Sequence, residues 1–128
     1  MTLADPLGPQ IRALFAALDH AGDLEAGPSS GDCRLVSGEA GREELGTRVR
    51  FALRMAGGCV QAVRFRAYGC PHTLATCEWL ARTLEGRPSG ALNPGSPLDW
   101  ARQLDVPAAK LGRLLVIEDA LQAALARQ

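Results

Sequence analysis

The chain has 128 residues, of which 47% are hydrophobic, enough apolar material for one domain over residues 1–128. Its 14 basic and 14 acidic residues balance, and the basic ones are spread along the chain, which argues against nucleic acid as the main partner. No apolar run approaches the ~20 residues that span a bilayer, and the first residues lack the pattern of a targeting segment. We therefore expect a cytoplasmic protein without a membrane partner.

The first predicted element is a helix over residues 7–20, with an apolar stripe made by Leu7, Ile11, Leu14, Phe15 and Leu18. Gly22 ends it, and residues 27–32 form a loop by composition. A histidine at a helix end is usually a favourable partner for the helix dipole. We expect this role for His20, rather than metal binding, because it lacks neighbouring residues at ligand spacing.

Three strands follow, over residues 33–38, 47–55 and 60–68, joined by a glycine-rich turn at 38–46 and a second turn at 56–58. The middle strand alternates clearly and places Val49, Phe51, Leu53 and Met55 on one face. The pattern predicts an antiparallel meander. Its up-down-up order puts Cys33 and Cys59 at the sheet end opposite Cys70, so we expect both to be structural.

The most informative stretch joins the third strand to a helix at Gly69, Cys70 and Pro71. Proline suits the first helical position, which makes Cys70 the expected cap residue, beside unpaired backbone N–H groups and the positive end of the helix dipole. A thiolate is favoured there, and thiolate is the form that binds metal or attacks sulfur. The alternative is that this cysteine is only a small buried hydrophobe.

Two neighbours of this thiol have less evident roles. Cys77 returns to the same helix face as Cys70 but lies ~10 Å further along the axis, beyond disulfide range, so we expect a core residue. His72 either turns toward the thiol or stands at a solvent-exposed helix start. We favour the exposed position, because adjacent helical positions point apart.

The last third of the chain is helical. A breaker-rich connection over residues 88–97 leads to a short helix at 97–104, a turn at 105–110, and a final helix from 107 or 108 to 126. The broad apolar face of this final helix should pack on the sheet. These elements together predict an α+β fold, a three-stranded antiparallel sheet packed against helices.

Residues 65–70, the helix after them, and residues 110–121 with Glu118, Asp119 and Ala120 resemble iron–sulfur cluster assembly scaffolds of the IscU and NifU N-terminal type. The resemblance runs from about Val36 to the C-terminus and implies the same α+β fold. It further implies a bacterial-type assembly protein that holds a [2Fe-2S] cluster on three cysteines from three loops. Its implied partners are a cysteine desulfurase, a chaperone and recipient apo-proteins.

Matched position by position, only one of the three family cysteines is present. Cys70 corresponds to the second cysteine. The first falls in the turn at 38–46, which offers Gly41, Arg42, Glu43 and Glu44, and either glutamate stands where the family has an aspartate. Arg113 occupies the third position. The family's chaperone-binding segment is represented by Val106, Pro107 and Lys110.

The resemblance therefore implies a scaffold-like protein, not an enzyme, that binds iron or a [2Fe-2S] cluster and accepts sulfur at Cys70. Glu43 and Arg113 would border the cluster position. A guanidinium cannot ligate metal, so Arg113 would instead stabilise the Cys70 thiolate. Further metal ligands would come from Glu43, Glu44 or His72, and the same set is the only one available for zinc. Two alternatives stay open: an adaptor without a cluster, and a carrier of persulfide on Cys70.

Overall fold

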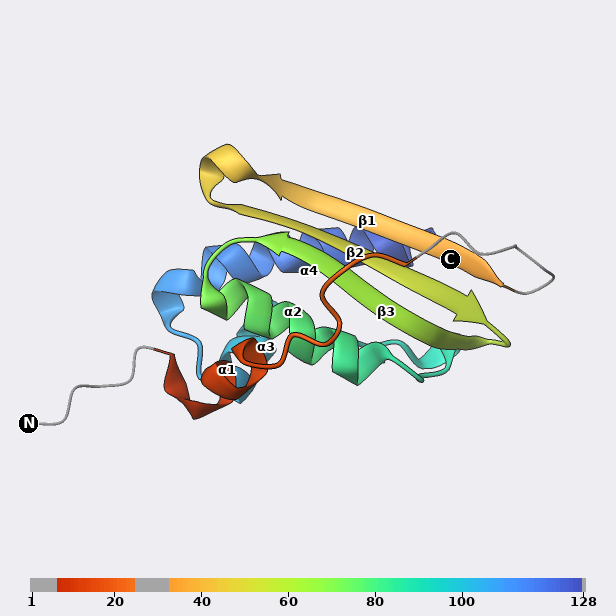
Figure 1. The fold of residues 1–128 in the computed structure, drawn as a ribbon, viewed down its shortest axis with the longest axis horizontal. Coiled ribbons are helices and arrows are strands. Elements are labelled where there is room, and N and C mark those ends of the chain that lie inside the picture. Colours follow the sequence, from red (N-terminus) through yellow and green to blue (C-terminus); the bar gives the residue numbers. More distant parts are fainter. Residues whose placement is uncertain (1–6, 25–32, 128) are drawn as a thin grey trace, which may run out of the picture.

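The computed structural model describes residues 7–24 and 33–127. Within them, helices and strands follow in the order α1 (Gly8–Phe15), β1 (Arg34–Arg42), β2 (Thr47–Ala56), β3 (Cys59–Tyr68), α2 (Pro71–Leu84), α3 (Pro97–Leu104) and α4 (Leu111–Leu125). The strands form one antiparallel sheet in the order β1-β2-β3 (Figure 1). The predicted α+β class, with a three-stranded meander, is confirmed.

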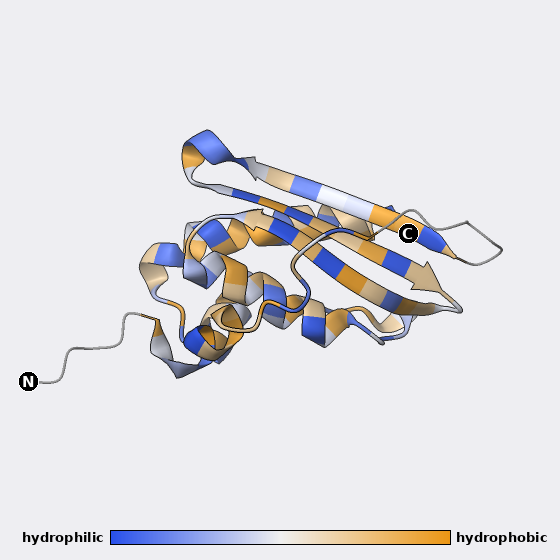
Figure 2. Ribbon diagram, in the orientation of Figure 1, coloured by the Kyte–Doolittle hydropathy of each residue, from blue (hydrophilic) through white to orange (hydrophobic). Residues whose placement is uncertain are grey.

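The helices cover one face of this sheet. α4 packs against β1 and β2, α2 packs against β3, and α1 contacts α2 (Figure 1). Hydrophilic and hydrophobic residues alternate along the strands (Figure 2). The covered face supplies the predicted core residues Val49, Phe51, Leu53 and Met55, all buried. Apolar burial on this single face is the main favourable contribution to folding. No helix in the described part of the chain is long and apolar enough to cross a membrane.

Several predicted boundaries are wrong in instructive ways. The first helix ends at Phe15 rather than residue 20. The first strand continues past residue 38 as far as Arg42, which pairs with Thr47. The expected turn at 38–46 therefore shrinks to the single 3₁₀ turn η1 (Glu43–Leu45). Two further 3₁₀ turns are η2 (Ser89–Ala91) and η3 (Ala108–Lys110), and η3 precedes α4, whose first residue is Leu111.

Gly38 explains why the first strand continues. This residue is paired with Phe51 and lies directly beneath α4. A Cβ atom at this position would overlap the backbone nitrogen of Ala124 and would lie 2.5 Å from the carbonyl oxygen of Ala120. Glycine is used here for close approach of two backbones, not as a breaker. The contact brings α4 down onto β1.

The segment after α1 is fixed to β3 and α2. Phe65 donates its backbone N–H to His20 O (3.0 Å) and accepts from Gly22 N (2.8 Å). The His20 ring lies 2.6 Å from the carboxylate of Glu78, which is fully buried and also accepts from Arg82 Nε at 2.7 Å. The expected role of His20 at a helix end is wrong, because α1 ends before it. A buried carboxylate needs such partners.

We predict that Gly38→Ala lowers the free energy of unfolding by about 1–3 kcal/mol, as overpacking does. Alanine normally favours a strand over glycine by only ~0.5–1 kcal/mol, and here both clashing groups are backbone atoms that cannot rotate away. Chemical denaturation measures the change. Gly90→Ala is the matched control, because a Cβ at Gly90 meets nothing within 4 Å. Equal stability of the two variants would contradict the close contact.

Candidate functional site

Cys70 lies at the corner where β3 becomes α2. It is the N-cap residue of α2, with extended φ and ψ of −83° and 171°, and Pro71 follows at the first helical position. The predicted corner is confirmed. Gly69 is exposed, and a Cβ atom there would lie 2.9–3.1 Å from the side chain of Thr73. The absence of a side chain at Gly69 lets the first turn of α2 fold back against the strand end.

The Cys70 sulfur is half-exposed and has polar neighbours in the first turn of α2. Its Sγ lies 3.6 Å from Thr73 Oγ1 and 4.0 Å from His72 Nδ1. Partial burial raises the pKa of Cys70. The hydrogen bond from the Thr73 hydroxyl, the backbone N–H groups of Thr73 and His72, and the charge of Arg113 outweigh that effect, so the net pKa is lowered. A lowered pKa favours the thiolate form of a cysteine over the neutral thiol.

Arg113 reaches this corner from the first turn of α4. It is half-buried, and its positive charge contributes to the lowered pKa of Cys70. A surface depression runs from Arg113 to the turn between β1 and β2, and its lining includes Gly41, Arg42, Leu45 and Gly112. The β1–β2 turn, the Cys70 corner and the start of α4 therefore lie at one end of the molecule.

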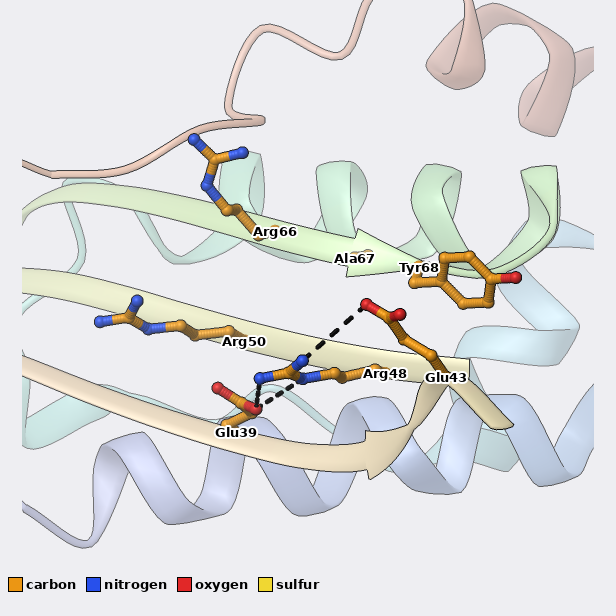
Figure 3. Close-up of a pocket in the computed structure, with 7 residues that line it drawn as sticks. All are labelled: Glu39, Glu43, Arg48, Arg50, Arg66, Ala67 and Tyr68. Carbon is orange, nitrogen blue, oxygen red and sulfur yellow. Dashed lines mark hydrogen bonds and ion pairs between the residues drawn. The ribbon is translucent and has the colours of Figure 1, made fainter. Parts of the chain in front are cut away.

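The other expected ligands are arranged less favourably. Glu43 is exposed and lies 3.8 Å from Arg48 on the uncovered face of the sheet (Figure 3). Glu44, the next residue in the chain, is also exposed. His72 is only 5% exposed, so its expected place at a solvent-exposed helix start is wrong. His72 lies in the first turn of α2, a helix that packs against β3.

The donor atoms present do not fit an iron–sulfur cluster. Such clusters are held by soft thiolates, and Cys70 is the one thiol at this end of the described structure. The described residues contain no group of three or more His, Cys, Asp or Glu side chains that could hold a metal ion. Arg113 has no lone pair to offer. A zinc site would require about four donors, which is also more than this corner supplies.

The remaining cysteines lie elsewhere, as predicted. Cys77 is fully buried, and burial raises the pKa of its thiol. Cys59 is paired with Ala56, and Cys33 precedes the Arg34–Met55 pair, so both lie at the sheet end opposite Cys70. All four cysteines are free thiols.

The segment expected to bind a chaperone connects α3 to α4. Val106 is buried in the core, Pro107 is exposed, and Lys110 is half-buried at the N-cap of α4. Only part of this segment is therefore available to a partner in this conformation.

Thr73 was not identified from the sequence. The signal that could have found it is its position three residues after the cap, since the cap and third helical positions of a helix face each other.

Comparison with known proteins accounts for this architecture. The model of the NifU-like N-terminal domain matches residues 10–127. The chain belongs to this family. The family predicted from the Tyr68-Gly69-Cys70 corner is therefore confirmed.

Two curated relatives show what this NifU-like domain is similar to. The chain is 40% identical over 81 residues to the bifunctional protein NifU/MnmA of Rubrobacter xylanophilus, a match that covers 62% of this chain and 15% of that protein. It is 25% identical over 96 residues to the iron-sulfur cluster assembly scaffold protein IscU of Escherichia coli, covering 74% and 75% of the two chains.

A solved structure supports the fold. The crystal structure of a candidate iron-sulfur cluster assembly scaffold for the SUF system from Fervidobacterium islandicum superposes with a TM-score of 0.67. The match covers 94% of this chain and 96% of that one, at 15% sequence identity. The backbone of the family is thus kept at low identity.

We predict that Thr73→Val raises the pKa of Cys70, because valine keeps the shape of the buried side chain but removes the hydroxyl that stabilises the thiolate. Arg113→Gln should raise it less, since the charge of Arg113 is the smaller contribution. The alkylation rate of Cys70 as a function of pH measures both. The variants should react more slowly than the wild type near neutral pH. At a pH high enough to ionise the Cys70 thiol in all three proteins, the rates should be the same.

Thr83→Val is the control for these measurements. Thr83 lies on the same helix and donates to Trp79 O at 2.8 Å, far from the cap. An alkylation midpoint that shifts as much in Thr83→Val as in Thr73→Val would contradict the assigned hydrogen bond.

Proposed function

We propose that this NifU-like domain acts in iron–sulfur cluster assembly as a sulfur acceptor, carrying persulfide on Cys70. The observation that carries the proposal is the half-exposed cap thiol with a lowered pKa. A cysteine desulfurase would supply the sulfur, and recipient apo-proteins or another scaffold would take it. The domain would then be a carrier rather than an enzyme, working in the cytoplasm.

The proposed transfer step is a thiol–persulfide exchange. The Cys70 thiolate attacks the outer sulfur of the desulfurase persulfide, and a new sulfur–sulfur bond forms on Cys70. The old sulfur–sulfur bond breaks, and its electron pair stays on the desulfurase cysteine, which leaves as a thiolate. The proton of the persulfide, if present, travels with the transferred sulfur. No oxidant or reductant is needed.

The residues around Cys70 suit this step. Thr73 and the cap N–H groups favour the attacking thiolate, and the same donors would favour the persulfide anion, which is also a soft monoanion. Arg113 adds a positive charge without competing as a nucleophile. The depression between Arg113 and the β1–β2 turn gives a partner access to this end of the molecule.

Iron or a [2Fe-2S] cluster would be cargo of the pathway, and its ligands would have to come partly from another protein. Arg113 at the family's third cysteine position favours the cluster-free alternative for this chain on its own. In either case Pro107 and Lys110 are the residues through which a chaperone would be engaged.

We predict that incubation with a cysteine desulfurase and cysteine adds one sulfur atom to the peptide that contains Cys70, measured by mass spectrometry under non-reducing conditions. Cys70→Ser should abolish the labelling. Cys59→Ser is the matched control, because Cys59 is also half-exposed but lies at the far end of the sheet. Labelling that persists in Cys70→Ser, or that falls equally on Cys33 and Cys59, would refute the acceptor role.

We also predict that anaerobic reconstitution with iron and sulfide loads little stable iron onto the wild type. Arg113→Cys combined with Glu43→Cys should increase bound iron and visible charge-transfer absorption, because two added thiolates would join Cys70. Gly41→Cys is a poorer choice: Gly41 has a φ of 86°, and its Cβ would overlap the carbonyl of Thr47.

The control for reconstitution is the same double variant with Cys70→Ser, which should lose the added iron. No gain in the double variant over the wild type would mean that Arg113 and Glu43 do not border a common site with Cys70.

A further inference from the structure

The uncovered face of the sheet carries a concentration of arginines. Because side chains alternate along a strand, the residues opposite the core face are Arg48, Arg50 and Arg54 on β2 and Arg64 and Arg66 on β3. Figure 3 shows Arg48, Arg50 and Arg66 standing on this face with the helices behind the sheet. The chain as a whole has no net charge, so this clustering is local.

The centre of the face is a like-charge pair. Arg50 and Arg66 are directly opposite each other across β2 and β3. Like charges at directly opposed positions destabilise a sheet. Glu39 lies opposite Arg50 on β1, but its carboxylate bonds Arg48, and Arg66 is paired with Asp23. Arg50 and Arg66 both line two adjoining depressions of the face, one reaching Tyr68 and the other reaching Leu35 and Gly22. A ligand on either depression would meet both guanidinium groups.

Arg50 is the arginine that has capacity left for a partner. Arg48 is engaged by Glu39 at 2.5 Å, Arg66 by Asp23 at 2.7 Å, and Arg64 by Glu85 at 3.4 Å. Arg50 takes part in none of the ion pairs between described residues, and it is exposed. Its five N–H donors suit a carboxylate.

We propose that this face, centred on Arg50, Arg66 and Tyr68, docks a protein partner through a surface segment rich in aspartate and glutamate. Carboxylates of the partner would form ion pairs with Arg50. They would also contact Arg66, which keeps its ion pair with Asp23. Tyr68, which is 54% exposed at the edge of the same depression, offers the kind of aromatic contact that anchors interfaces.

A protein segment fits this face better than a nucleic acid does. Glu39, Glu43 and Asp23 lie among the arginines, at the rim of the depressions. A continuous chain of phosphates would meet these carboxylates and be repelled, whereas a folded partner can place basic or polar groups opposite them. The mixed pattern of charges therefore favours protein recognition, and it does not depend on any chemistry at Cys70.

The test uses the whole chain and a synthetic peptide whose central segment alternates glutamate and alanine and whose two ends carry lysines, at low ionic strength, with binding followed by NMR shifts of backbone amides. Arg50→Glu is the test variant, and Arg102→Glu is the matched control with the same change of charge on exposed α3. We expect shifts centred on Arg50, Arg66 and Tyr68, and binding about tenfold weaker in Arg50→Glu, equivalent to about 1.4 kcal/mol. Arg102→Glu should bind within about twofold of the wild type.

The melting temperature of Arg50→Glu tells whether the substitution weakens docking or destabilises the fold. Glutamate at this position faces Arg66 on β3 and Glu39 on β1, so the substitution gains one opposite-charge pair and one like-charge pair, and the melting temperature should change little. Equal weakening in Arg102→Glu, or no peptide binding by the wild type, would overturn the proposal. So would oligothymidylate or inorganic phosphate binding at Arg50 as tightly as the peptide, which would make the face a phosphate site.

Discussion

The contact between Gly38 and the backbone of α4 is the constraint on which the arrangement of this molecule depends. It allows a helix to lie directly on an edge strand, with no side chain between their backbones. α4 then spans the sheet from β1 to β2, and its first turn comes to the end of the molecule where β3 ends. Gly38 lies on the edge strand β1, and Cys70 follows β3 at the opposite edge of the sheet. The position of Arg113 relative to Cys70 thus depends on a glycine at the far edge.

This arrangement places the Cys70 thiol at the N-cap of α2, where its pKa is lowered. Burial of the sulfur would by itself favour the neutral thiol, but a cap position surrounds it with N–H donors and a hydroxyl, and these prevail. This member of a family that includes a named cluster scaffold has a cap thiol with a lowered pKa and the charge of Arg113 near it. Those residues suit an exchange of sulfur more than the holding of metal.

The sequence predicted the parts of this structure that depend on local pattern. Alternation along residues 47–55 and 60–68 identified the sheet and its core face, and the Gly69-Cys70-Pro71 corner identified the cap. Prediction from the sequence failed where contacts between segments that are distant in the chain determine the structure. Gly38 was interpreted as the start of a turn because its reason for being glycine is α4, more than eighty residues later in the chain. His72 was expected to be exposed, and the partnership of His20 with Glu78 was not foreseen, for the same reason.

The buried carboxylate of Glu78 gives the segment before the sheet a role in cooperativity. This segment, residues 20–22, pairs with β3 through only a few backbone hydrogen bonds. A segment held by these bonds alone would be expected to fray. Its release, however, would remove the His20 ring and backbone N–H from a carboxylate that has no access to solvent. Opening this segment would therefore leave a buried charge without two of its partners, and the segment should exchange its amide hydrogens together with α2 rather than independently.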